Sequence, residues 1–364
     1  MRGNRIGIRG AAAALAAAVS AALLTGCGAV SPDTGTAGTM SASAESESQS
    51  SQETTAAAAA QNAAPKVVTP AYTKDLAPLA HGDTSQIAQT IVYGSGGAYD
   101  DTDFSVPDGY GTERDDVTYG DYIADLTYYS QAAGMEKTFN IVLPAGYDES
   151  QSYPVLYLLH GYGGNPNEWN AARIVCGNLQ AAGQMPPCII VQPDEWTSQN
   201  SKDGAGFSDW ISAFAAFSDD LTGSLMPYIE ENYAAATGKE NTAVLGLSMG
   251  GWQALSIAFH NPGLFGYVGA LAPMVGALDT SITRQFMSSD LSKLDMEDPD
   301  DIPYYIMQNY GTEEPWDKEA TDEYRKSMTE NGIPNAFYII EGTGHDGNTW
   351  VPGLYNFAGR IFRN

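Results

Sequence analysis

Ser248 lies in a sequence pattern that can give a hydroxyl group nucleophilic chemistry. It is the third residue of the pentapeptide G-L-S-M-G at 246–250. A short apolar run precedes the pentapeptide, and apolar residues at helical spacing follow it until Asn261-Pro262. A strand, a sharp turn and a helix would point the hydroxyl outward, and a glycine two residues away on either side leaves room for the turn. The pattern therefore predicts a nucleophile elbow.

A serine hydroxyl is a weak nucleophile until a base removes its proton and a third group orients that base. For an elbow of this type the chain order is serine, acid, histidine. Of the four histidines, His81 and His160 precede Ser248, and His260 ends the helix of the elbow itself. We therefore predict that His345, in a glycine-rich segment after an apolar run, is the base.

The acid that orients His345 must lie between the serine and the histidine, just after a strand. An apolar run leads into the segment G-T-E-E-P-W-D at 311–317. Glu314 is the favoured residue, Glu313 the second choice and Asp317 the third. The carboxylate would accept the Nδ1 proton of His345 and stabilise the imidazolium that forms during attack.

A glycine-rich loop is the fourth part of this chemistry. The segment H-G-Y-G-G at 160–164 follows a wholly apolar run. Such a loop can turn backbone N–H groups toward the elbow, where they would bind a developing oxyanion. The predicted donors are the N–H groups of Tyr162 and Met249, with Gly163 as the alternative to Tyr162.

The elements that must position these residues alternate along the chain. From about residue 117 onward, strand-like and helix-like stretches succeed one another, which predicts a mostly parallel sheet flanked by helices, an α/β fold. Runs that are apolar throughout suit strands buried on both faces. The predicted strands are 137–143, 155–159, 188–191, 243–247, 268–271, 304–307 and 336–340, and the predicted helices are 221–233 and 318–331.

The first 27 residues predict an export signal that is not part of the fold. Three arginines precede a short apolar core, which ends in L-T-G-C at 24–27. This ending resembles the lipobox of bacterial lipoproteins, in which the cysteine, here Cys27, receives lipid. A plain secretory signal is the alternative. We expect an exported protein that is anchored to the cell surface through Cys27.

Three further parts are expected after the signal. Residues 28–65 are rich in small and polar residues and predict a disordered tether, because they cannot bury enough apolar surface to offset the entropy of ordering. Residues 66–115 have no sustained period and are expected to form an extended segment packed on the domain. Residues 116–364 form the predicted α/β domain.

The net charge limits the classes of binding partner that are expected. The net charge of −27, from 44 acidic and 17 basic residues, disfavours nucleic acid and anionic membrane surfaces. Contact of the protein with a membrane is expected only through the lipid on Cys27.

Apart from Cys27, the chain has two cysteines, Cys176 and Cys188, and two buried thiols are favoured over a disulfide. No C-x-x-C or H-E-x-x-H metal-binding spacing occurs, so no metal is expected.

Taken together, these segments resemble the esterase family of α/β-hydrolases that includes esterase D and, most closely, bacterial feruloyl esterases attached to xylanases. The resemblance covers about residues 104–364. Its motifs lie at 107–110, 143–147, 153–164, 225–230, 232–233, 246–251, 311–312, 344–346, 350 and 352–354. The family usually has aspartate where this chain has Glu314; glutamate serves as the acid in other α/β-hydrolases, so activity is expected to survive.

The resemblance implies hydrolysis of ester-linked acyl groups, such as ferulate and acetate on plant xylan, through an acyl-enzyme on Ser248 and without a cofactor. Aromatic residues near the expected opening of the substrate cleft could hold a phenolic acyl group or a sugar ring. They are Tyr162, Trp169, Trp196, Trp252 and Trp350. The loop 194–210 is the expected variable edge of the substrate cleft.

Other functions remain open at this stage. The same fold could serve an acyltransferase, as in the mycolyltransferases, if a sugar or lipid hydroxyl replaced water. A siderophore-ester hydrolase or an S-formylglutathione hydrolase is also compatible with the fold, although the second fits an export signal poorly. From a different class, the chain could be a non-catalytic carbohydrate-binding lipoprotein, but the serine, histidine and glycine-rich loop are all intact.

Overall fold

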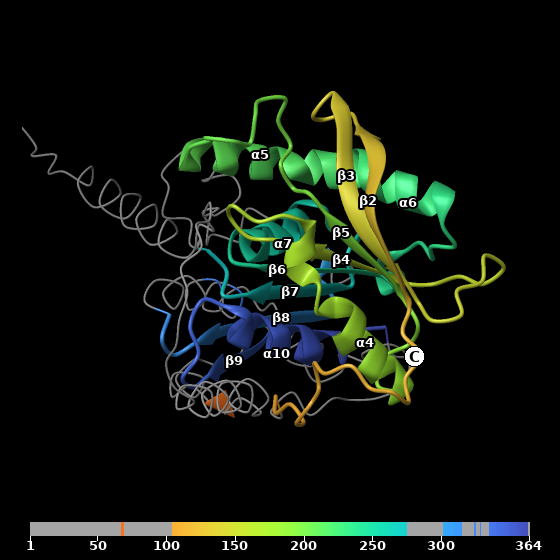
Figure 1. Ribbon diagram of the computed structural model, residues 1–364. Helices are drawn as coiled ribbons and strands as arrows, with labels where there is room; N and C mark the ends of the chain where they lie inside the picture. The colour runs from red at the N-terminus through yellow and green to blue at the C-terminus, as the bar shows by residue number, and fades with distance from the viewer. Residues whose placement is uncertain are drawn as a thin grey trace, which may run out of the picture. The chain divides into compact units, whose positions relative to one another are not determined.

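A twisted sheet runs through the computed structural model, which describes residues 67–68, 104–274, 301–314, 324, 328 and 335–362 (Figure 1). All of these residues belong to one compact unit. The strand order is β1-β9-β8-β7-β6-β4-β5-β3-β2. Within the row β9-β8-β7-β6-β4-β5, each strand pairs in parallel with its neighbours. Strand β3 pairs antiparallel with both β5 and β2. The predicted α/β-hydrolase architecture, a mostly parallel sheet flanked by helices, is confirmed.

The predicted strands form at or within a few residues of their expected positions. In β4, β5, β6, β7, β8 and β9 every residue is buried, as expected for parallel strands covered on both faces. The strand bounds are β1 Val67–Val68, β2 Asp121–Ser130, β3 Met135–Leu143, β4 Val155–Leu159, β5 Ile189–Pro193, β6 Thr242–Leu247, β7 Tyr267–Leu271, β8 Tyr305–Gly311 and β9 Ala336–Ile340.

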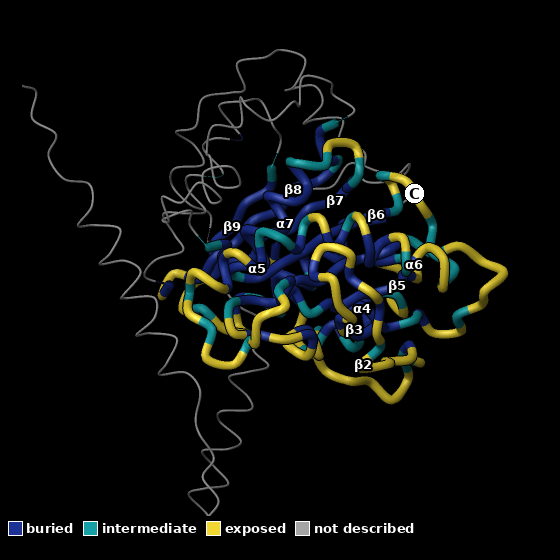
Figure 2. Tube along the Cα trace, turned by 90° about the horizontal axis from the view of Figure 1, so that it is seen from above, coloured by how far each residue is buried: buried dark blue, intermediate teal, exposed yellow. Residues whose placement is uncertain are grey.

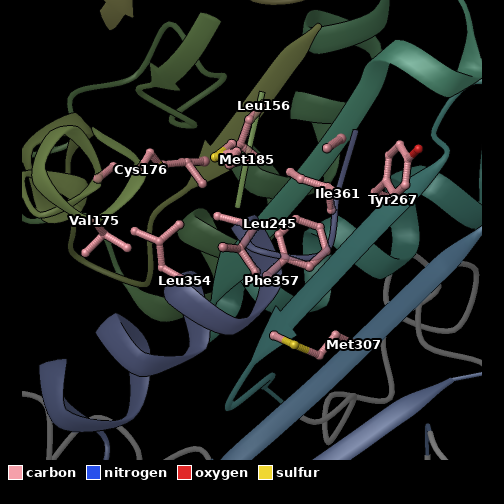
Figure 3. Packing of buried hydrophobic residues seen from close by; sticks show 14 of the residues in the cluster. Leu156, Val175, Cys176, Met185, Leu245, Tyr267, Met307, Leu354, Phe357 and Ile361 are labelled. Atoms are coloured by element: carbon pink, nitrogen blue, oxygen red, sulfur yellow. The ribbon is translucent and has the colours of Figure 1, made fainter. Parts of the chain in front are cut away.

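Two hydrophobic clusters cover the two faces of the sheet, because successive side chains of a strand point to opposite faces. In β4, Leu156 and Leu158 belong to one cluster and Tyr157 and Leu159 to the other. The first cluster includes side chains of α4 and α10 (Figure 3), and the second includes side chains of α5, α6 and α7. The helix bounds are α4 Ala172–Ala181, α5 Phe207–Asp220, α6 Met226–Asn232, α7 Met249–His260 and α10 Gly347–Ala358.

The strand β2 is absent from the sequence prediction. It lies at the open end of the sheet and most of its residues are exposed (Figure 2), so its composition lacks the apolar run that marks the inner strands. Its pairing with β3 shifts register between Ile123 and Leu126. At this β-bulge Asp125 has φ 56°, and its N–H donates to Oδ1 of Asn140 at 3.0 Å.

The predicted helix at 221–233 is part of a longer helical stretch. It begins with α5 at Phe207, passes through a π-helix at Leu221–Leu225 and continues as α6. The expected loop 194–210 therefore ends at Gly206, which is a correction. Most of the predicted helix at 318–331 lies outside the described residues.

Phe104, the first residue of the described segment 104–274, packs on the α/β domain. The ring of Phe104 stacks on that of Tyr338 with centroids 4.3 Å apart, and Nδ2 of Asn356 donates to the Phe104 carbonyl at 2.8 Å. The export signal, Cys27 and the tether lie outside the described residues. Within the described part, no helix has both the length and the apolar composition needed to cross a membrane.

Candidate active site

Ser248 occupies the turn between β6 and α7 in a strained backbone conformation. Its φ is 54° and its ψ is −118°, a region that residues with a Cβ rarely adopt. A Cβ at Gly246 would lie 2.0 Å from the carbonyl oxygen of Gly250, which explains why the turn needs glycine. The serine is half-buried and becomes the N-cap of α7. The strained turn expected from the pentapeptide is therefore present.

Glu314 and His345 lie side by side. Nδ1 of His345 lies 3.3 Å from Oε2 of Glu314, and Oε1 of Glu314 accepts the N–H of Gly311 at 3.0 Å. The Glu314 side chain has no exposed surface, while that of His345 is 17% exposed. A buried carboxylate can hold the imidazole in one orientation while the ring stays reachable from solvent.

Among the acids considered from the sequence, the structure places only Glu314 in this contact. Glu313 is exposed, and its backbone N–H donates to the carbonyl of Thr343. Asp317 lies outside the described residues. Ser248, Glu314 and His345 follow β6, β8 and β9, which are parallel strands, so all three lie at the same edge of the sheet.

The loop 160–164 lies directly against the elbow. A Cβ at Gly161 would lie 3.4 Å from Cβ of Ser248, and one at Gly250 would lie 2.3 Å from the carbonyl oxygen of His160. The N–H of Gly161 donates to Oε2 of Glu168 at 2.8 Å. In the described part of the chain the backbone N–H groups of Tyr162 and Met249 donate to no protein acceptor. They are therefore available to an incoming oxygen atom.

Glu195 is a residue of this region that the sequence analysis missed. It follows β5, its side chain has no exposed surface, and it contacts His160 at the start of the loop. Burial raises the pKa of the Glu195 carboxyl to about 8. No motif surrounds it, and the only local signal is an acidic residue just after an apolar strand.

The predicted substrate aromatics divide into two groups. Trp169 and Trp252 are 2% and 1% exposed, and Nε1 of Trp169 donates to the carbonyl of Leu159 at 2.9 Å. Both indoles are enclosed by protein, which speaks against the predicted role of these two residues as substrate contacts. Trp196 is also buried, and its Nε1 donates to the carbonyl of Asn200 at 3.0 Å.

One of the predicted aromatic rings lies beside a candidate catalytic group, and another packs on α5. Trp350 is half-buried and stands edge-on to the His345 imidazole, with ring centroids 5.4 Å apart. The ring of Tyr162 is also half-buried and packs against Phe207 and Trp210 at 5.4 and 5.2 Å. Phe207 lies in the first turn of α5, where the sequence predicts a loop.

Cys176 and Cys188 are free, buried thiols. Burial raises the pKa of the Cys176 thiol to about 12 and that of Cys188 well above its ordinary value. Neither is poised as a nucleophile, since the thiolate is the reactive form. Among the described residues, no group of histidine, cysteine and carboxylate side chains has the arrangement of a metal site.

The geometry of a strained serine, a buried acid–histidine pair and an adjoining glycine-rich loop agrees with comparisons to known proteins. A family model described as "Putative esterase" matches residues 130–338, more than half of the chain. This chain belongs to that esterase family.

Two known proteins are each 30% identical to this chain. A protein of Xylanibacter ruminicola named endo-1,4-beta-xylanase/feruloyl esterase is 30% identical over 260 residues, which cover 69% of this chain and 32% of that protein. The chain thus spans about a third of the length of this curated relative. The structure of a ferulic acid esterase from Anaeromyces mucronatus is 30% identical with a TM-score of 0.65, and the match covers 71% of this chain and 97% of that one.

A third comparison concerns the fold alone. The S-formylglutathione hydrolase of Staphylococcus aureus is 15% identical, with a TM-score of 0.52, over 68% of this chain and 98% of that one. The chain therefore shares its architecture with an enzyme that is named for a different substrate.

Proposed function

We propose that this esterase is an exported serine carboxylesterase that removes feruloyl or acetyl groups from plant cell-wall polysaccharide such as xylan. The observation that carries the reaction is the 3.3 Å contact between Nδ1 of His345 and Oε2 of Glu314, at the sheet edge that also bears Ser248. The substrate class rests on the similarity to the xylanase/feruloyl esterase and to the ferulic acid esterase, each 30% identical.

In the proposed first half-reaction, Oγ of Ser248 attacks the ester carbonyl carbon while Nε2 of His345 takes its proton. Glu314 accepts the Nδ1–H and stabilises the imidazolium. The N–H groups of Tyr162 and Met249 bind the oxyanion of the tetrahedral intermediate. The C–O bond to the alcohol then breaks, His345 returns the proton to the departing alkoxide, and the acyl group remains on Ser248.

In the second half-reaction, water takes the place of the alcohol. Nε2 of His345 removes a proton from the water as its oxygen attacks the acyl carbon, and the same oxyanion donors bind the second intermediate. Collapse breaks the bond to Ser248, whose oxygen recovers the proton from His345. The products are a carboxylic acid and the free serine, so neither a metal nor a cofactor enters these steps.

Export and lipid anchoring at Cys27 are part of the proposal and rest on the sequence of the first 27 residues. A polymer such as xylan cannot enter the cell, so an enzyme held outside on a tether would meet it directly.

The test is release of ferulate from methyl ferulate and from feruloylated arabinoxylan by the full chain, with Ser248→Ala as the control. Release by the wild type alone is the expected result. Release by the Ser248→Ala variant would refute the acyl-enzyme. Cleavage of p-nitrophenyl acetate without ferulate release would refute the feruloyl assignment and point to acetyl groups. Transfer products that appear when a sugar acceptor is added would favour acyl transfer.

A further inference from the structure

Glu195 is a buried carboxyl group for which the proposed reaction has no use. Its Oε1 accepts the backbone N–H of His160, while its Oε2 has no partner in the described part of the chain. Enclosing a carboxyl group in protein costs free energy unless specific bonds compensate for the lost water. The residue and its bond to His160 therefore need an explanation.

The contact between Glu195 and His160 is reciprocal. The backbone N–H of Glu195 donates to Nε2 of the His160 imidazole at 3.2 Å. Because Nε2 accepts a hydrogen bond, Nδ1 carries the proton, and it donates to the carbonyl oxygen of Gly161 at 2.8 Å. Two of these hydrogen bonds join the end of β4 to the residue that follows β5 by two positions, and the third lies within the loop between His160 and Gly161.

The same bonds determine which N–H groups of the loop remain available. The N–H of His160 points to Glu195, and the N–H of Gly161 points to Glu168. Tyr162 supplies the next N–H, which donates to no protein acceptor within the described residues. The N–H held by Glu195 thus lies two positions before that of the proposed oxyanion donor, and the intervening N–H is held by Glu168.

The peptide of His160 also lies against the second proposed donor. The carbonyl oxygen of Leu159, which shares a peptide with the His160 N–H, and the carbonyl oxygen of His160 would lie 2.7 and 2.3 Å from a Cβ at Gly250, in the first turn of α7. Met249 immediately precedes Gly250 in that turn. A shift of the His160 peptide would therefore change the separation of the Tyr162 and Met249 N–H groups.

The segment that carries Glu195 is itself anchored in the core. The carbonyl oxygen of Glu195 accepts the hydroxyl of Thr197 at 3.2 Å, and Nζ of Lys137 donates to the same hydroxyl at 2.7 Å. Lys137 is buried and forms an ion pair with Asp220 at 2.5 Å. Glu195 therefore connects the buried Lys137–Asp220 ion pair to the loop 160–164.

We propose that Glu195 is a positioning residue of the oxyanion hole: by holding the His160 N–H, it places the Tyr162 N–H where negative charge develops in the transition state. This inference rests on the proposed roles of Ser248 and Tyr162. Displacing one donor is expected to cost less than the about 10²- to 10³-fold in rate that removing a donor costs.

The experiment compares Glu195→Ala and Glu195→Gln in the full chain, with p-nitrophenyl acetate as substrate. Glu195→Ala is expected to lower kcat roughly 10- to 100-fold with KM little changed, because the oxyanion contact forms only in the transition state. Glu195→Gln is expected to retain most of the activity, because its amide oxygen can still accept the His160 N–H. Affinity for a boronic acid, which forms a tetrahedral adduct with the serine, should fall in parallel with kcat.

Val191→Ala is the matched control, because Val191 is a buried residue of β5, the strand that precedes Glu195, and it pairs with Ile141 and Tyr157 in the sheet. It is expected to lower the free energy of unfolding while leaving kcat and boronic acid affinity near the wild-type values. The inference is overturned if Glu195→Ala keeps its kcat, if it raises KM alone, or if Val191→Ala loses as much activity at equal stability. Activity in the Ser248→Ala variant would instead refute the proposed function, and the inference with it.

Discussion

Nδ1 of His345 lies 3.3 Å from Oε2 of Glu314, while Oε1 of the same carboxylate accepts the N–H of Gly311. One oxygen of the acid is thus tied to the end of its own strand, and the other faces the imidazole. This arrangement places the carboxylate at a buried, fixed point beside His345, and the proposed mechanism makes Glu314 the residue that orients the base.

Glu314→Gln is expected to lower kcat/KM for p-nitrophenyl acetate by up to about 10⁴, by analogy with removal of the triad carboxylate in other serine hydrolases. The amide can keep the bond to Gly311 but cannot stabilise the imidazolium. The neighbouring change Glu313→Gln should leave the rate near that of the wild type, because Glu313 is exposed. A large loss in Glu313→Gln with none in Glu314→Gln would contradict the assignment.

Stability should fall as pH rises because of Glu195. Burial raises the pKa of its carboxyl from the ordinary 4.5 to about 8; His160 opposes this rise, and the charges of Asp194 and Glu168 add to it. The folded state therefore keeps a proton that the unfolded state releases above about pH 4.5. The contribution is fully present below about pH 4.5 and is lost as pH rises toward 8.

Urea unfolding of the wild type and of Glu195→Gln at pH 5, 7 and 9 measures this contribution. The amide cannot ionise, so the difference in unfolding free energy should shift in favour of Glu195→Gln as pH rises. A difference that is independent of pH would show that Glu195 ionises as easily in the folded protein as in the unfolded chain.

Gly250→Ala should reduce activity by displacing the loop 160–164. The added methyl group would meet the His160 carbonyl oxygen at 2.3 Å and the Leu159 carbonyl oxygen at 2.7 Å, so the loop has to move. Such overpacking typically costs about 1–3 kcal/mol in unfolding free energy. Gly223→Ala is the control, because nothing lies within 4 Å of its Cβ. Wild-type kcat in Gly250→Ala would show that the loop and elbow are not tightly coupled.

Trp169→Phe should destabilise the fold without changing substrate binding. The indole is 2% exposed, and removing Nε1 leaves the buried Leu159 carbonyl without this donor, which costs about 1–3 kcal/mol. Thermal unfolding together with KM for methyl ferulate distinguishes the two roles. A raised KM with unchanged stability would restore Trp169 as a substrate contact.

Cys27→Ser should move the full chain from the membrane fraction of the producing cells into the medium. Lipid on Cys27 is the proposed anchor, and each buried CH₂ of an acyl chain contributes about 0.8 kcal/mol to membrane binding. Cys176→Ala, which removes a buried thiol of the domain, should leave the distribution unchanged. Equal membrane fractions for the wild type and Cys27→Ser would exclude the lipid anchor.

The sequence predicts the inner sheet and much of the candidate site because these parts have local signatures. The run at 155–159 is apolar throughout, and the structure buries every residue of β4. Gly246 reflects a contact within the turn itself, with the carbonyl oxygen of Gly250. Glu314 follows from chain order and from its place after a strand.

The missed features depend on contacts between distant residues. An exposed edge strand such as β2 pairs on one side only, so its residues need no apolar pattern. The burial of Trp169 and Trp252 depends on ring direction, which spacing along the chain does not specify. Glu195 reaches across from β5 to the backbone of His160, 35 positions earlier in the chain.

The bulge at Asp125 has a consequence for how copies of this protein meet one another. An open strand edge offers unpaired N–H and C=O groups to which a second chain can add, a common start of aggregation. The shifted register and the φ of 56° interrupt that edge in the middle of β2, and the Asp125 N–H is already used by Asn140. The exposed end of the sheet is therefore a poor template for strand addition, which favours solubility where many molecules are crowded together.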